Sequence, residues 1–178
     1  MEEMVNEEPF ILSSTVYSAL LVSHGIRSNA RLILYFADSN YIDFISNKIR
    51  NVRPDMQSTI GIFRKVILLK SRKRLMKPRK TIKILPGISY RSLEFSKLII
   101  NSDGIFFHEP EGQDIRTLKF SSKFKFIVFY PHANISDIKT LLEKGAKPIK
   151  VAPKYKLPGP IIMVVNNYVD RGGVKNHD

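Results

Sequence analysis

The sequence predicts an α/β fold in which a mainly parallel sheet is flanked by helices. Its second half alternates short apolar runs, typical of buried strands, with a segment of helical period. Its length of 178 residues is enough for one domain with its own core. Hydrophobic residues make up 43% of the chain and aromatic residues 10%, which argues against a disordered basic tail. We therefore expect a single α/β domain over residues 1–178.

The chain up to residue 100 carries signals for four helices and several strands. In chain order we expect a helix beginning at Ser13 or Ser14, a strand over 31–36, a helix over 41–49, a helix opened by Pro54 and Asp55, extended pieces at 82–85 and Ile88, and a helix over 92–100. The strand over 31–36 is a short apolar run followed by turn residues. The period over 41–49 is weak, and the one after Asp55 is stronger.

The second half predicts the strands that hold the site. We expect a strand over 104–108 ending in an acidic turn at 109–113, a strand over 125–130, a helix capped by Ser136 and ended by Gly145, and strands over 148–151 and 160–165. Ligands of parallel sheets bind outside the carboxyl ends of the strands. The loops after these strands are therefore the expected site.

Charge is distributed unevenly along the chain. Lysine and arginine number 29 against 16 aspartate and glutamate residues, a formal charge of +13. Residues 1–8 form an acidic N-terminal tail, whereas 64–83 holds ten basic residues and no acid, including a basic linker at 70–83. Such a tract repels itself and is typical of a surface that contacts phosphate. Nucleic acid is the expected partner.

Several classes of protein are excluded by what the sequence lacks. There is no cysteine, which removes disulfides, thiolate metal sites and cysteine nucleophiles and fits a cytoplasmic protein. The four histidines are dispersed and show no metal-binding spacing. No apolar run reaches the roughly 18 residues of a membrane span, so no membrane partner is expected.

Short segments along the chain resemble the archaeal tRNA pseudouridine N1-methyltransferases of the SPOUT class. The segments are 18–27 (SALLVSHGIR) with Arg31, 53–59 (RPDMQST) with Arg64 and Lys65, Gly87 and Ile88 with Ser92, 109–115 (EPEGQDI) and 165–171 (VNNYVDR). Each match alone is weak. Together they cover about 150 residues in the order of the family, which makes the set moderately specific.

The resemblance implies a SPOUT fold whose C-terminal part, 104–171, is tied into a trefoil knot that binds S-adenosylmethionine, in a homodimer. It implies a methyl transfer to N1 of a pseudouridine in the T loop of tRNA. Asp55 is the candidate for orienting the base or accepting its proton, and the alternative is a carboxylate that caps its helix. The implied cofactor-binding residues are His108, Tyr130, Val151, Ala152, Pro153 and Leu157. The candidate RNA contacts are Arg27, Arg31, Arg53, Lys65, Arg72, Lys73 and Arg74.

Three positions depart from the pattern of the family. Tyr130 and Ala152 stand where the family has glycines, and His108 stands where it has a leucine. A glycine in a cofactor loop allows close approach of the backbone, and Tyr130 adds bulk there. Three hypotheses follow: an RNA methyltransferase, a non-catalytic SPOUT-like RNA-binding or assembly protein that has lost the cofactor, and a DNA-associated protein of unrelated fold.

Overall fold

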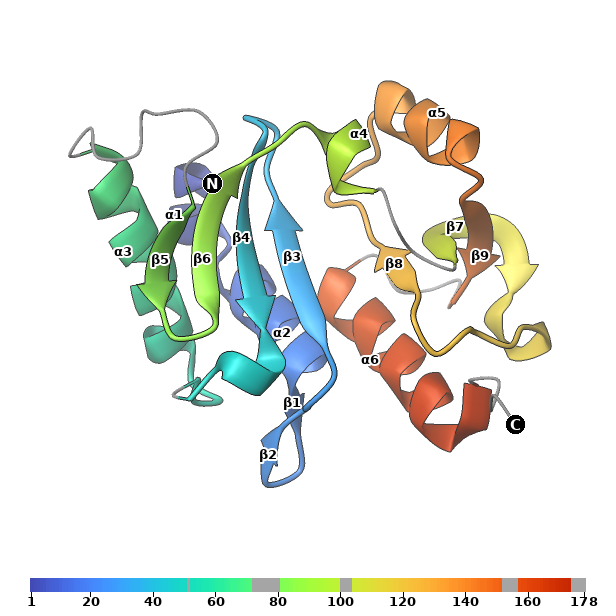
Figure 1. Ribbon diagram of the computed structural model, residues 1–178, viewed down its shortest axis with the longest axis horizontal. Helices are drawn as coiled ribbons and strands as arrows, with labels where there is room; N and C mark the ends of the chain where they lie inside the picture. Colours follow the sequence, from blue (N-terminus) through green and yellow to red (C-terminus); the bar gives the residue numbers. More distant parts are fainter. Residues whose placement is uncertain (51, 72–80, 100–103, 152–156, 174–178) are drawn as a thin grey trace. The chain divides into compact units, whose positions relative to one another are not determined.

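The chain forms two compact units, residues 1–94 and 95–178, in the computed structural model (Figure 1). The structure describes residues 1–50, 52–71, 81–99, 104–151 and 157–173. Each unit has its own sheet and its own buried cluster of side chains. That the whole chain works as a single SPOUT-like domain stays a prediction.

The first unit is a four-stranded antiparallel sheet with helices packed on it. Its elements are α1 (Glu2–Glu7), α2 (Pro9–Leu20), β1 (Leu21–Val22), β2 (Gly25–Ile26), β3 (Arg31–Tyr35), β4 (Asn40–Ile45), the 3-10 turn η1 (Ser46–Lys48), α3 (Met56–Ser71), β5 (Ile82–Leu85) and β6 (Ile88–Ser92). The strand order is β3-β4-β6-β5, and β1 pairs with β2 separately. Val16 and Leu20 of α2 and Phe63 of α3 share one core with Ile42 and Phe44 of β4.

The second unit is a three-stranded parallel sheet. Its elements are α4 (Phe95–Leu98), β7 (Ile105–Asp114), the turn η2 (Ile115–Thr117), β8 (Lys125–Ile127), α5 (Ile135–Glu143), β9 (Lys147–Lys150), α6 (Pro158–Tyr168) and the π-helical turn η3 (Val169–Gly173). The order is β8-β7-β9, with β7 in the centre. The parallel arrangement predicted from the alternating pattern is therefore confirmed here, whereas the first unit corrects it. There, β3 and β4, like β5 and β6, are joined by tight turns, which connect antiparallel strands.

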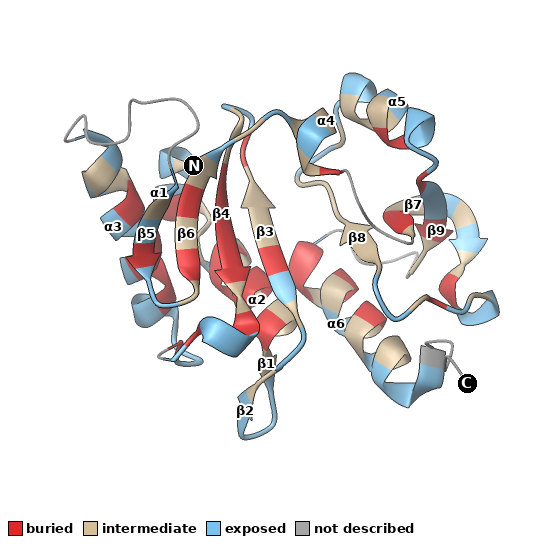
Figure 2. Ribbon diagram, viewed as in Figure 1, coloured by how far each residue is buried: buried red, intermediate tan, exposed pale blue. Residues whose placement is uncertain are grey.

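Three predicted helices differ from those observed. The segment 41–49 is a strand, β4, followed by η1, because a central strand paired on both sides is buried on both faces and lacks the alternation that marks a half-exposed strand. Figure 2 shows the buried residues along β4. The helix predicted over 92–100 is reduced to α4, since β6 extends to Ser92. The helix predicted to begin at Ser13 or Ser14 is α2, which begins at Pro9 and follows α1, a helix within the predicted acidic tail. Ser14 and Thr15 lie inside α2, where their hydroxyls donate to the carbonyl of Ile11.

The strand predicted over 160–165 is wrong, because these residues lie in α6. A short apolar run cannot distinguish a buried strand from a buried helix. Pro158 occupies the first turn of α6, where no backbone N–H is needed. At the other end of α6, the Tyr168 hydroxyl donates to the carbonyl of Leu118 over 2.6 Å, which ties the helix to the chain that follows η2.

Smaller corrections concern the ends of elements in the second unit. The helix α5 is capped by Asn134, whose Oδ1 accepts from the Ser136 N–H, so Ser136 is not the cap. The strand predicted over 125–130 ends at Ile127. The predicted acidic turn at 109–113 lies within β7, where the register against β9 shifts between His108 and Gln113.

The register shift in β7 depends on Gly112. A Cβ atom at this position would lie 2.6 Å from the backbone nitrogen of Ile149, so the two strands approach too closely for any other residue. The helical Gly61 of α3, by contrast, has nothing within 4 Å of such an atom.

We expect Gly112→Ala to destabilise the protein by about 1–3 kcal/mol, because overpacking displaces β9. Gly61→Ala is the matched control and should stabilise it by about 0.5–1 kcal/mol, since alanine is the better helix former. Urea unfolding measures both. Equal stability of Gly112→Ala and the parent would show that β7 and β9 separate at no cost.

Candidate functional site

The carboxyl ends of the three parallel strands bring together part of the predicted cofactor site. His108 pairs with Ile149 across β7 and β9, and Ile127 ends β8 beside Phe107. Val151 directly follows β9, and Tyr130 lies three residues beyond the end of β8. Sequence positions separated by about 40 residues thus meet at one edge of the sheet, as the predicted strands require.

His108 offers a polar group at this edge. Its Nδ1 atom is buried and has no hydrogen-bond partner among the described residues. Burial lowers the pKa of His108 from 6.5, and the backbone of Ile149 and the charge of Glu109 offset part of that effect. The imidazole is therefore neutral at pH 7 and can accept or donate one hydrogen bond to a bound group.

The remaining predicted cofactor residues follow the ends of β8 and β9 in the sequence. Tyr130 and Val151 are half-buried, and Leu157, which precedes the first residue of α6, is exposed. Ala152 and Pro153 lie outside the described residues. The described edge fits an adenosine-containing cofactor in one respect, because it combines apolar side chains with an unpartnered buried ring nitrogen.

Asp55 caps helix α3 in the first unit. Its two carboxylate oxygens accept from the N–H and from the hydroxyl of Ser58, both over 2.7 Å. The N–H and the hydroxyl of Ser58 lower the pKa of the Asp55 carboxyl, and Arg53 adds to the effect. The capping alternative is thus the arrangement observed. The catalytic role stays a prediction, in which an acidic carboxyl orients a base better than it removes a proton.

Arg31 is held by a buried partner that sequence reasoning missed. The Nε and Nη2 atoms of Arg31 on β3 donate to the two carboxylate oxygens of Asp43 on β4, over 2.8 and 2.9 Å. The Asp43 side chain is fully buried, whereas that of Arg31 is 52% exposed. The hydrogen bonds to Asp43 raise the pKa of Arg31. The helix predicted over 41–49 gave no indication of this partner. The alternation of side chains along a strand would have placed Asp43 across from β3.

The other predicted RNA contacts are dispersed over the first unit. Arg53 is exposed, and Arg27, just after β2, is half-buried. Lys65 on α3 donates to the carbonyl of Ile84 on β5 over 3.0 Å, so it also ties helix to sheet. Arg72, Lys73 and Arg74 lie outside the described residues.

Two further observations bear on the class of protein. Within the described ranges, no three histidine, aspartate or glutamate side chains are placed to hold a metal ion. No helix in the same ranges is long and apolar enough to cross a membrane.

Comparison with known proteins identifies the family. The profile of the family described as "Putative SAM-dependent RNA methyltransferase" matches residues 10–174. The tRNA (pseudouridine(54)-N(1))-methyltransferase of Thermococcus onnurineus is 28% identical over 169 residues, which cover 90% of this chain and 82% of that protein. The enzyme of the same name from Methanosarcina acetivorans is 27% identical over 169 residues, or 90% of this chain and 77% of that one.

A solved structure shows the fold. The crystal structure of Archaeoglobus fulgidus Nep1 bound to S-adenosylhomocysteine aligns with a TM-score of 0.60, over 92% of this chain and 70% of that one, at 11% identity. The hypothesis of a DNA-associated protein of unrelated fold is therefore wrong, and the resemblance to the pseudouridine N1-methyltransferases is confirmed. The chain belongs to the family of S-adenosylmethionine-dependent RNA methyltransferases.

Proposed function

We propose that this protein methylates N1 of pseudouridine 54 in the T loop of tRNA. The observation that carries the proposal is the match to relatives of that name along about four-fifths of their length, in a chain whose family profile spans residues 10–174. The formal charge of +13 suits an RNA substrate. Such a protein works in the cytoplasm.

The cofactor, when bound, supplies a methyl group already activated by a sulfonium. The residues of the chain then have to position two reactants and stabilise charge on the base, and neither a metal nor a covalent nucleophile is needed. In this proposal His108, Tyr130, Val151, Ala152, Pro153 and Leu157 hold the cofactor. Residues 104–171 form the trefoil knot of the SPOUT fold.

The basic residues hold the RNA in this proposal. Arg27, Arg31, Arg53 and Lys65 contact phosphates from the first unit, and the tract with Arg72, Lys73 and Arg74 adds further positive charge. Phosphate contacts fix the position of a nucleic acid without reading its sequence.

Asp55 orients the target base in this proposal, and Asp55→Asn and Asp55→Ala separate that role from capping. Asparagine caps a helix about as well as aspartate, so Asp55→Asn should melt like the parent and lose methyl transfer. Asp55→Ala should also melt at a lower temperature. The folded pKa is lowered, so the stabilisation is complete above about pH 4 and is lost as the pH falls through the folded pKa. The difference in melting temperature should therefore shrink in acid. Full activity of Asp55→Asn would leave Asp55 as a cap alone.

Tyr130 favours a second candidate, an RNA-binding or assembly protein without the cofactor, because its ring stands where the family has a glycine. Calorimetric titration with S-adenosylmethionine decides between the two. We expect the parent to bind, Tyr130→Gly to change the affinity modestly, and Tyr130→Phe, which keeps the ring, to bind like the parent. A parent that binds nothing, with a Tyr130→Gly variant that binds, would establish the second candidate.

A homodimer completes the proposal, with both subunits forming the RNA surface. Its support is the family resemblance together with exposed apolar side chains on the second unit, such as Met163 of α6, which is 60% exposed. Light scattering at micromolar concentration should give about twice the 20.4 kDa of the chain. A particle of monomer mass would contradict it.

A further inference from the structure

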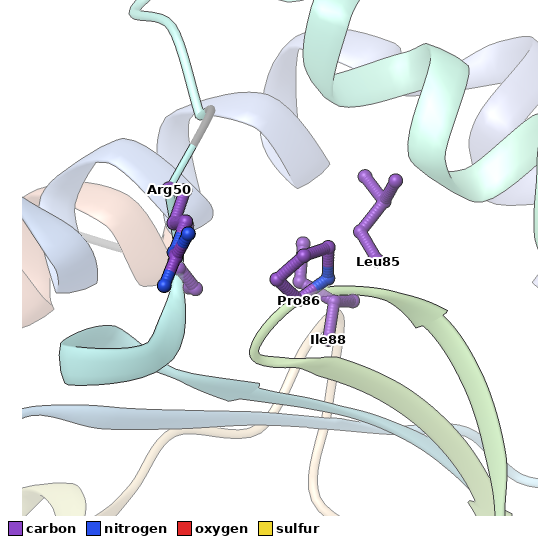
Figure 3. Close-up of a pocket in the computed structure, with 5 residues that line it drawn as sticks. Arg50, Leu85, Pro86 and Ile88 are labelled. Atoms are coloured by element: carbon purple, nitrogen blue, oxygen red, sulfur yellow. The ribbon is translucent and has the colours of Figure 1, made fainter.

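A small hollow opens on the first unit between the turn that joins β5 to β6 and the segment after η1. Its lining residues are Ile49, Arg50, Leu85, Pro86 and Ile88. Figure 3 shows Arg50 on one side of the hollow and Leu85 and Pro86 on the other. Arg50 is the one charged residue of this lining, so the hollow is an apolar slot with a guanidinium at its edge.

The walls of the hollow are held in place by backbone contacts. Gly87 has a φ of +75°, and a Cβ atom there would lie 2.7 Å from the backbone nitrogen of Ile49, so the turn packs directly on the segment after η1. The N–H of Ile45 donates to the carbonyl of Gly87 over 2.8 Å. Ile49 and Ile88 are buried beneath, whereas Arg50, Leu85 and Pro86 are exposed at the rim. A ligand would therefore meet a preformed surface.

The charge around the hollow is positive. The described segments that border it, 46–50, 52–53 and 81–88, contain Lys48, Arg50, Arg53 and Lys83, all exposed, and no acidic residue. The nearest acid in sequence, Asp55, accepts two hydrogen bonds from Ser58. The surface therefore suits a ligand with an apolar planar part and negative charges beside it.

The strand register places Arg31 at the same end of the sheet. Arg31 pairs with Ile45, Phe44 pairs with Ile88, and Ile88 pairs with Leu85. The start of β3, the end of β4 and the β5–β6 turn thus lie at the same end of the sheet. The guanidinium of Arg31 reaches from this end along the sheet to Asp43, which pairs with Ile33. Both side chains lie on the face opposite Phe44 and Ile88, so Arg31 is not part of the hollow.

We propose that an unpaired nucleobase of the RNA substrate stacks on the exposed rim of this hollow, formed by Arg50, Leu85 and Pro86, while Lys48 and Arg53 contact the flanking phosphates. Proline, leucine and the plane of an arginine guanidinium provide stacking surfaces for a base. The proposal rests on the RNA-binding function proposed above. It assigns a nucleotide-binding subsite to Arg50, Leu85 and Pro86, which the sequence comparison with the family does not single out.

The test compares two variants with two matched controls. Leu85→Ser removes an apolar wall, and Arg50→Gln removes the charge and shape of the guanidinium. Leu142→Ser and Lys139→Gln make the same kinds of change at exposed positions on α5, in the other unit. The probe is a T-arm RNA hairpin with pseudouridine at the target position, titrated at several salt concentrations. Melting temperatures establish that all four variants fold.

We expect Leu85→Ser to weaken hairpin binding about fivefold without changing the salt dependence, because it removes stacking area and no charge. Arg50→Gln should weaken binding and reduce the slope of log K against log salt by about one. Arg50→Lys should restore that slope without restoring the full affinity, since lysine has no planar face. Both controls should stay within about twofold of the parent at moderate salt.

The proposal is overturned if Leu85→Ser and Arg50→Gln bind the RNA hairpin as tightly as their controls do. In that case the hollow contacts a protein partner and not a nucleobase. Titration of the same variants with S-adenosylmethionine keeps this failure distinct from failure of the proposed function. If the parent binds cofactor and methylates the hairpin while the variants bind RNA normally, only the subsite is wrong. If the parent binds no RNA, both proposals fall.

Discussion

Strand β7 holds the second unit together, because β8 and β9 pair with it and not with each other. Its side chains alternate between two separate cores. Phe107 packs with Leu141 and Ala146 on one face, and Phe106 packs with Phe120 and Val165 on the other. The ring centroids of Phe106 and Phe120 lie 4.8 Å apart, edge to face. The edge with His108 is therefore positioned by packing on both faces of one strand.

The pairing of β7 with β9 is irregular in the second half of β7. After His108 the strand departs from β9 and rejoins it at Gln113, so Ile149 is opposite two residues of β7. Gly112 permits this return because its backbone lies against Pro148 and Ile149. Beyond it, Asp114 pairs with Arg116, which holds the pKa of the Asp114 carboxyl at about 2. The acidic segment that resembles the family motif is thus a structural part of the sheet.

Basic side chains in the first unit stabilise the fold and are also the expected RNA contacts. Arg31 neutralises the buried Asp43, Lys65 donates to β5, and Lys70 pairs with Asp38 over 2.9 Å. An unpaired carboxylate at the site of Asp43 would be costly, so Arg31 is constrained before any RNA binds. A residue already fixed in this way loses little conformational freedom when it contacts a phosphate. In the proposed function, folding and RNA binding therefore use the same side chain.

The sequence was sufficient to predict the family and the parallel strands β7, β8 and β9. Local patterns suffice there, since short apolar runs flanked by turn residues mark strands and ordered motifs mark relatives. The assignment of 41–49 to a strand and of 160–165 to a helix came from the tertiary structure, because a short apolar run carries no periodicity that tells a strand from a helix. The partner of Arg31, the close packing at Gly112 and the hollow beside Arg50 also emerged only from the folded chain. Each depends on which backbone segments lie side by side, and a local sequence pattern does not contain that information.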